Sequence, residues 1–142
     1  MKKILFIATG GTIASKKTEN GLTPQITPEE LLAYIPEVKG LCEITAVQPF
    51  NLDSSNVVPE NWEALVKVVK EQYDAFDGFV IAHGTDTMAY TAAALSYMIQ
   101  NSSKPIVITG AQRPINLDIT DAKTNLSDSF YYACDDASQG VQ

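Results

Sequence analysis

Short runs of apolar residues alternate along this chain with longer segments in which apolar residues recur at helical spacing. The apolar runs, typical of strands covered on both faces, lie at residues 4–8, 44–47, 79–82 and 105–109. The segments with helical spacing lie at residues 28–35, 59–73, 86–100 and 119–133. Repeated strand–helix units favour right-handed crossovers, so we expect an α/β fold whose parallel-rich (mixed) sheet has helices on both faces.

Local signals mark where several of these elements begin. Thr27, Pro28 and Glu30 form a capping-box pattern with proline at the first helical position. Residues 14–26 are polar and punctuated by Gly and Pro, a pattern that predicts a mobile loop able to close over a ligand. Residues 140–142 follow a helix and read as the start of a further strand. Because a domain seldom stops on entering a core strand, we expect a fragment of a longer protein.

Charge and composition narrow the range of ligands. The chain of 142 residues carries 10 basic and 17 acidic side chains, a net charge of −7, and no cluster of Lys or Arg. This balance argues against nucleic acid and anionic membranes and favours a small-molecule ligand. Cys42 and Cys134 lack the spacing of a zinc site or a disulfide framework. The apolar start is too short for a secretory signal or a membrane span, so we expect a soluble, cytoplasmic protein.

Three polar turns follow the predicted strands. They contain Thr9-Gly10-Gly11-Thr12, Asp53-Ser54-Ser55-Asn56 and His83-Gly84-Thr85-Asp86-Thr87. The carboxyl ends of parallel strands converge on one crevice, where such hydroxyls and carboxylates could act on one ligand. Each turn also has a plain explanation: the glycines could form a simple turn or a phosphate loop, Thr85 and Asp86 could cap a helix, and the serines could form ordinary turns.

These motifs, together with Thr109-Gly110-Ala111-Gln112-Arg113-Pro114, resemble the amino-terminal domain of bacterial-type L-asparaginases, and more narrowly the cytoplasmic type I enzymes. The resemblance implies that residues 1–142 form most of a Rossmann-like catalytic domain, incomplete at the carboxyl end, with the rest of that domain and a smaller carboxy-terminal domain missing. It also implies hydrolysis of L-asparagine to L-aspartate and ammonia, with no cofactor or metal, by a homodimer or homotetramer. This stretch alone would then be inactive.

The resemblance also assigns roles to individual residues. Thr12 would be the nucleophile, Thr85 would activate water or Thr12, and Asp86 would hold the α-amino group of the substrate. The turn around Ser54 would bind the α-carboxylate. The full set of implied substrate-binding residues is Gly11, Asp53, Ser54, Ser55, Gly84, Thr85 and Asp86. His83, the only histidine, is left out because a lone histidine at the end of a buried strand is usually structural.

The chain departs from the family pattern in two places. The lysine that completes the family's proton relay would lie beyond Gln142, and Lys123 does not match its position. Many relatives carry a tyrosine in the loop over the substrate, where Leu22 stands here. Two alternatives remain: an asparaginase-like subunit of a tRNA-dependent amidotransferase, expected to carry an additional amino-terminal domain, and a non-catalytic domain that binds asparagine or aspartate. A nucleotide site is not indicated, because neither GxGxxG spacing nor a Walker lysine is present.

Overall fold

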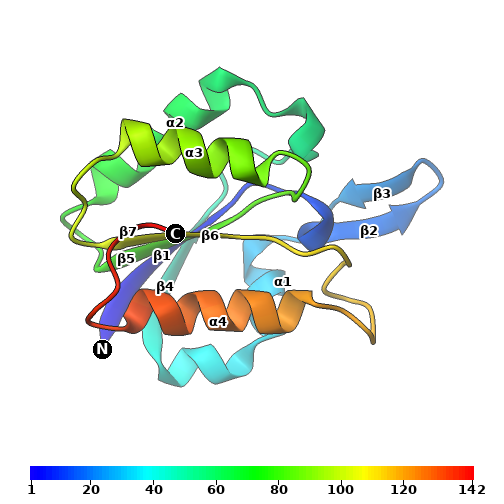
Figure 1. The fold of residues 1–142 in the computed structure, drawn as a ribbon. Coiled ribbons are helices and arrows are strands. Elements are labelled where there is room, and N and C mark those ends of the chain that lie inside the picture. The colour runs from blue at the N-terminus through cyan, green and yellow to red at the C-terminus, as the bar shows by residue number, and fades with distance from the viewer.

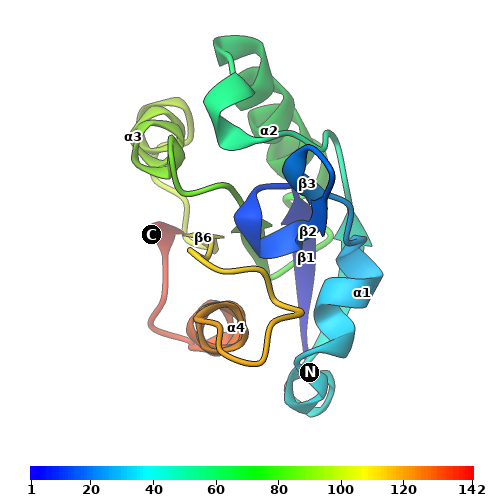
Figure 2. The ribbon, with the colours of Figure 1, turned by 90° about the vertical axis from the view of Figure 1, so that its right-hand side faces the viewer.

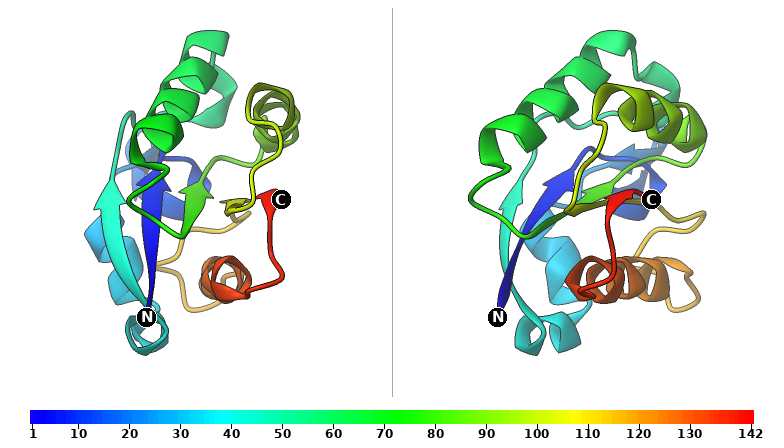
Figure 3. Two further views of the ribbon diagram at one scale, coloured as in Figure 1. Left: turned by 90° about the vertical axis from the view of Figure 1, so that its left-hand side faces the viewer. Right: turned by 60° about the vertical axis from the view of Figure 1, so that its left-hand side comes forward.

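A computed structural model describes all residues, 1–142, as one parallel sheet between two layers of helices (Figure 1). The sheet has the strand order β4-β1-β5-β6-β7, and every pairing within it is parallel. Its strands are β1 (Lys2–Ala8), β4 (Cys42–Val47), β5 (Gly78–Ala82), β6 (Pro105–Thr109) and β7 (Gly140–Val141). The left panel of Figure 3 shows this order from β4 to the short edge strand at the carboxyl end.

The strand order places a topological switch point between β1 and β5. The chain moves from β1 outwards to β4 on one side and then returns to β5 on the other side of β1. In open parallel sheets, loops on the two sides of such a point leave in opposite directions and open a crevice at the carboxyl ends of the strands. The loops that follow β1 and β5 are those that carry Thr12 and Thr85.

The helices cover both faces of the sheet, as Figure 2 shows, with α2 and α3 on one side and α1 and α4 on the other. Side chains of β1 alternate between two cores: Phe6 contributes to the core under α4, where it meets Phe130 edge-on with ring centroids 5.7 Å apart, and Leu5 to the core under α2. The α-helices are α1 (Pro28–Ala33), α2 (Pro59–Gln72), α3 (Met88–Met98) and α4 (Ala122–Cys134), and the 3-10 helices are Thr12–Ala14, Pro36–Gly40 and Ser54–Asn56. None of the helices is long and apolar enough to cross a membrane.

The predicted fold class is confirmed, and so are the predicted strands, including the one at residue 140. The predicted cap of α1 is present, because the Thr27 hydroxyl accepts a hydrogen bond from Glu30 N at 3.2 Å. Two helices begin later than predicted: α3 at Met88 rather than at residue 86, and α4 at Ala122 rather than at residue 119. Before α4, the Thr120 hydroxyl bonds to backbone groups on both sides, and such local bonds compete with the helix.

The segment predicted as a mobile loop forms a β-hairpin. β2 (Ser15–Thr18) and β3 (Gly21–Pro24) pair in antiparallel fashion and project beyond the carboxyl ends of the sheet strands (Figure 1). Gly21 adopts a φ of 93° at the turn, and the Thr18 hydroxyl donates to its carbonyl at 2.8 Å. At the base, Asn51 Nδ2 donates to Pro24 O at 3.0 Å. The polar composition therefore reflects an exposed ribbon.

Candidate functional site

Backbone hydrogen bonds join the loops that leave β1, β4 and β5. Gly11 N donates to Leu52 O at 3.0 Å, and Leu52 N donates back to Thr9 O at 2.9 Å. Both the N–H and the hydroxyl of Thr9 donate to Ala82 O, at 3.0 and 2.7 Å. The loop after β1 is thus held between the other two, which fixes the position of the residues that follow.

Glycines allow these loops to touch through their backbones. Gly11 has a φ of 80°, in the left-handed region, and a Cβ built on it would lie 2.5 Å from both N and Cα of Gly84. A Cβ on Gly84 would in turn lie 2.6 Å from the Cβ of Ser54. Since no side chain fits between them, the three loops form one compact wall. The Gly10-Gly11 pair therefore allows the neighbouring loops to approach closely and does not merely form a turn.

A small polar cavity of about 50 Å³ opens where the loops meet. It is lined by Gly11, Thr12, Ser15, Leu22, Pro24, Asp53, Ser54, Gly84, Thr85 and Asp86. This set contains every residue that the sequence pointed to as part of the site except Ser55. The exposed Ser55 points its hydroxyl to Asp53 Oδ1, at 2.9 Å, and lies outside the cavity lining.

Three polar side chains in this lining have no hydrogen-bond partner within the chain: Thr12, Thr85 and Asp86. The backbone N–H groups of Thr85 and Asp86 also lack a protein acceptor. Helix capping does not occupy them, because the residue before α3 is Thr87 and no side chain caps that helix. Two hydroxyls, a carboxylate and two N–H donors therefore remain available to a ligand in one cavity.

Ser54 links the loop after β4 to the start of α3. It is buried, its Oγ accepts a hydrogen bond from Thr87 N at 3.4 Å, and its carbonyl accepts one from the Thr87 hydroxyl at 2.8 Å. Because Oγ only accepts here, the hydroxyl proton of Ser54 is free to be donated to a ligand. Asp53 has a structural role as well, since its Oδ1 accepts from Ser55 N at 3.0 Å and caps the 3-10 helix.

His83 is fully buried and lies outside the cavity lining. Its Nδ1 lies 2.7 Å from Gly84 O, which can only accept, so the ring donates there. Nε2 then accepts from the Thr91 hydroxyl at 2.9 Å, and that hydroxyl accepts from Trp62 Nε1 at 2.9 Å. Burial lowers the pKa of His83, although the bond to the Gly84 carbonyl opposes this shift. A neutral His83 thus holds the Gly84 peptide in place from behind.

The lowered pKa of His83 predicts a loss of stability in mild acid. A histidine whose folded pKa lies below its unfolded pKa binds its proton more tightly when unfolded, so its contribution is complete above about pH 6.5 and is lost as the pH falls below that value. The ring protons of His83, the one histidine of residues 1–142, can be followed by NMR as the pH is lowered. We expect the titration midpoint of the folded state to lie below 6.5, because burial lowers the pKa of the ring. A midpoint at or above 6.5 would contradict the neutral, buried ring.

The hairpin supplies a part of the cavity wall, from the segment that the sequence predicted to close over a ligand. Leu22, 51% exposed, and Pro24 lie on it, and Ser15 at its base donates from its hydroxyl to Gly11 O at 2.7 Å. Leu22 departs from the pattern that the resemblance implies, and Ser15 and Pro24 belong to the segment predicted to close over a ligand. Which of these side chains line the cavity depends on how the hairpin folds back over the loop after β1.

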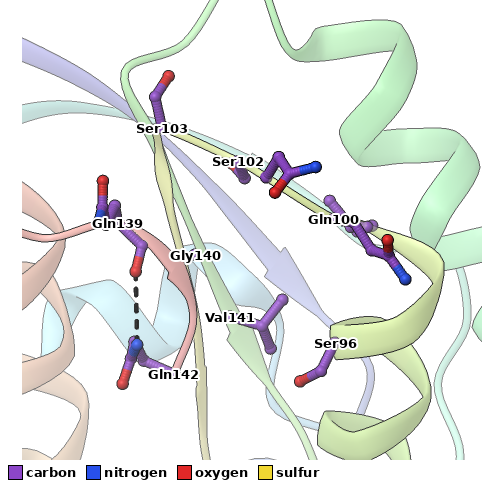
Figure 4. Close-up of a pocket in the computed structure, with 10 residues that line it drawn as sticks. Ser96, Gln100, Ser102, Ser103, Gln139, Gly140, Val141 and Gln142 are labelled. Carbon is purple, nitrogen blue, oxygen red and sulfur yellow. Dashed lines mark hydrogen bonds between the residues drawn. The ribbon is translucent and has the colours of Figure 1, made fainter.

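A larger hollow lies elsewhere, between α3 and the edge strand β7 (Figure 4). It has a volume of about 700 Å³ and is lined mainly by serine and amide side chains together with Ile99 and Val141, and Gln142 Nε2 donates to Gln139 O at 3.4 Å. It contains no acidic or basic side chain. We therefore place the candidate site in the smaller cavity at the strand ends. Nowhere in the chain do three or more His, Cys, Asp or Glu side chains gather as they would around a metal ion.

Comparison with known proteins points to one family over nearly the whole chain. Residues 3–142 match the family described as Asparaginase, N-terminal. An L-asparaginase of Thermococcus kodakarensis is 43% identical over 133 residues, covering 92% of this chain and 40% of that protein. A glutamyl-tRNA(Gln) amidotransferase subunit from Sulfolobus acidocaldarius is 42% identical over 137 residues, covering 92% of this chain and 30% of its own length.

A solved structure has the same fold. The thermostable L-asparaginase from Thermococcus kodakarensis superimposes with a TM-score of 0.86 at 39% identity, over 98% of this chain and 42% of that one. The chain thus spans about 40% of the length of the L-asparaginases it matches. Family match, sequence identity and fold agree on the same region, and on these grounds the chain belongs to the asparaginase family, of which it carries the N-terminal domain sequence.

Proposed function

We propose that the protein hydrolyses the side-chain amide of L-asparagine, releasing L-aspartate and ammonia. The observation that carries this proposal is the set of unpaired polar groups from Thr12, Thr85 and Asp86 in one cavity at the switch point of the sheet. The cavity is small and polar, which suits an amino acid better than a large ligand. The similarity to L-asparaginases supports the same reaction.

In the proposed mechanism, Thr12 attacks the carbonyl carbon of the amide through its hydroxyl oxygen. Thr85, on the neighbouring loop, activates either Thr12 or the water that later completes hydrolysis. A threonine hydroxyl is a weak nucleophile until a base removes its proton, and the developing oxyanion needs nearby donors. The free N–H groups of Thr85 and Asp86 are suitable donors.

Recognition of the amino acid needs two opposite charges to be matched. Asp86 provides a carboxylate for the α-ammonium group, which requires a charged partner once it leaves water. The free hydroxyl proton of Ser54 is available to the α-carboxylate. Ser55 is left out of this proposal because its hydroxyl is bonded to Asp53 outside the cavity.

The proposed machinery is completed by other parts of the protein. No lining side chain is basic, so we propose that a lysine outside residues 1–142 takes the proton of Thr85. A second protomer would then contribute an acidic group within a cytoplasmic homodimer or homotetramer. We expect residues 1–142 on their own to bind the ligand weakly and to lack turnover.

A glutamine-dependent role is the second candidate, and the comparisons favour it nearly as strongly. The amidotransferase subunit is 42% identical and the asparaginase 43% identical over almost the same part of the chain. Ammonia release from L-asparagine and from L-glutamine, measured side by side with the whole protein, separates the two candidates. Release from neither, with binding of asparagine retained, would instead indicate a sensing domain.

Replacing Asp86 by asparagine is expected to weaken substrate binding. The change removes the charge that pairs with the α-ammonium group but keeps the size of the side chain, so KM should rise about 10- to 100-fold. The measurement is steady-state ammonia release at varied L-asparagine. Asp118→Asn, a change in the turn before α4, is the matched control and should leave KM unchanged. An unaltered KM for Asp86→Asn would remove this carboxylate from the proposed recognition.

A further inference from the structure

Two cysteines that are far apart in the sequence meet at the amino-terminal edge of the sheet, on the side opposite the cavity. Cys42 begins β4 and pairs in register with Lys2 of β1, and Cys134 is the last residue of α4. Lys2 Nζ contacts Asp136 Oδ1 at 2.7 Å, which ties the end of α4 to the start of β1. Cys134 packs against the core cluster that contains Cys42 and adds to the rise that burial causes in the pKa of the Cys42 thiol, whose Sγ donates to Val38 O at 3.9 Å.

We propose that Cys42 and Cys134 form a redox pair that closes to an intramolecular disulfide when the protein meets a peroxide or a small-molecule disulfide. A dithiol reopens it. The inference uses residues remote from the cavity and does not depend on the proposed function. The sequence alone suggested two unrelated thiols, because nothing in their spacing shows that the start of β4 and the end of α4 lie side by side.

Exposure fixes the order of the chemical steps. Cys134 is half-buried, whereas Cys42 is only 3% exposed, so an oxidant reaches Cys134 first. Its thiolate attacks one oxygen of hydrogen peroxide, breaks the O–O bond and becomes a sulfenic acid, and one water is released. The sulfur of Cys42 then attacks that of Cys134, the S–O bond breaks and a second water leaves. Two thiols are oxidised and one peroxide is reduced to two waters.

The surroundings make the pair slow to react at neutral pH. Burial raises the pKa of both thiols, that of Cys42 to about 12. At Cys134, the interaction with Cys42 and the charge of Lys2 oppose this rise in pKa, and the charge of Asp77 adds to it. Since the thiolate is the reacting form, closure should be slow at pH 7 and should accelerate several-fold for each unit of pH above it. A brief exposure to oxidant would leave the pair open.

The disulfide would enclose nearly two-thirds of the chain, including the loops that carry Ser54 and Thr85. A crosslink over so long a loop stabilises the fold mainly by restricting the unfolded chain. We expect the midpoint of thermal unfolding to rise by on the order of 10 °C on oxidation.

The test begins with the reduced protein, which is treated with hydrogen peroxide or with oxidised dithiothreitol, alkylated and digested without reduction. Mass spectrometry should then find one pair of linked peptides, containing Cys42 and Cys134. The link should join two cysteines of the same chain and not two different chains. Reduction should remove the link and the gain in thermal midpoint. Cys42→Ser and Cys134→Ser are the matched controls, and neither should show the gain. Cys42→Ser should also accumulate a sulfenic acid at Cys134 that reacts with dimedone.

The peptide map of the natural sequence shows whether the disulfide between Cys42 and Cys134 forms, even if a serine variant fails to fold. The proposal is overturned if both thiols remain open to alkylation after prolonged oxidation at pH 9. It is equally overturned if Cys134 is oxidised without becoming linked, or if only links between molecules are found.

Discussion

Thr12→Ala is expected to reduce ammonia release from L-asparagine by about 10³-fold or more while binding of the amino acid is retained. The substitution removes the hydroxyl that attacks the amide and leaves the recognition groups of Asp86 and Ser54 in place. Because the Thr12 side chain forms no hydrogen bond within the chain, its loss should cost little stability. The rate is measured by an ammonia assay on the whole protein, and binding by calorimetry.

Two variants show whether this loss is specific. Thr18→Ala removes a threonine hydroxyl from the hairpin, where it bonds to Gly21 O and does not line the cavity, so the rate should stay near that of the natural protein. Thr12→Ser keeps a hydroxyl at the site and should retain measurable turnover. If Thr12→Ala hydrolyses asparagine at the natural rate, the nucleophile lies elsewhere.

Gly11→Ala is expected to destabilise the fold by about 2–4 kcal/mol. The new Cβ would sit 2.5 Å from backbone atoms of Gly84, and residue 11 would keep a φ of 80° that side chains disfavour. The loops after β1 and β5 would have to separate, which would also disturb the cavity. The free energy of unfolding is measured by chemical denaturation.

Gly21→Ala is the matched control for this effect. Gly21 has a similar backbone conformation, with a φ of 93°, but its Cβ would meet no atom within 4 Å. It should therefore show only the cost of the left-handed conformation, about 1 kcal/mol. Equal losses of unfolding free energy in the two variants would show that close contact between the loops does not contribute to stability.

The parallel sheet was predictable because its strands are covered on both faces. Residues 4–8 and 79–82 are buried along their whole length, and such strands appear in the sequence as unbroken apolar runs. The same reasoning explains why the strand-end loops could be expected to converge. Parallel strands deliver their carboxyl ends to one edge of the sheet, whatever the lengths of the connections between them.

Features that depend on contacts between distant residues were not predictable. The hairpin at residues 15–24 lacks an apolar run, since it is exposed on both faces for much of its length. Its base is held by Asn51, from the loop after β4. The late start of α4 follows from the hydrogen bond between the Thr120 hydroxyl and the carbonyl of Arg113. The proximity of Cys42 to Cys134 likewise arises from the packing of α4 against the sheet.

In the candidate site, the turn after β4 contains one serine whose predicted role fits the structure and one whose predicted role does not. Ser54 and Ser55 are adjacent and chemically identical, so nothing in the sequence separates them. In the fold, Ser54 is buried against Thr87 and faces the cavity, whereas Ser55 turns outward to Asp53. A 3-10 helix of three residues rotates successive side chains by about a third of a turn, and that rotation decides which hydroxyl can reach a ligand.

A crystal structure of the Thr12→Ala protein with L-asparagine bound tests the central claim most directly. We expect the amino acid in the strand-end cavity, with its α-ammonium group within hydrogen-bond distance of Asp86 and its amide carbon facing residue 12. Binding of asparagine in the hollow beside β7, or in the cavity with its amide turned away from residues 12 and 85, would contradict the account.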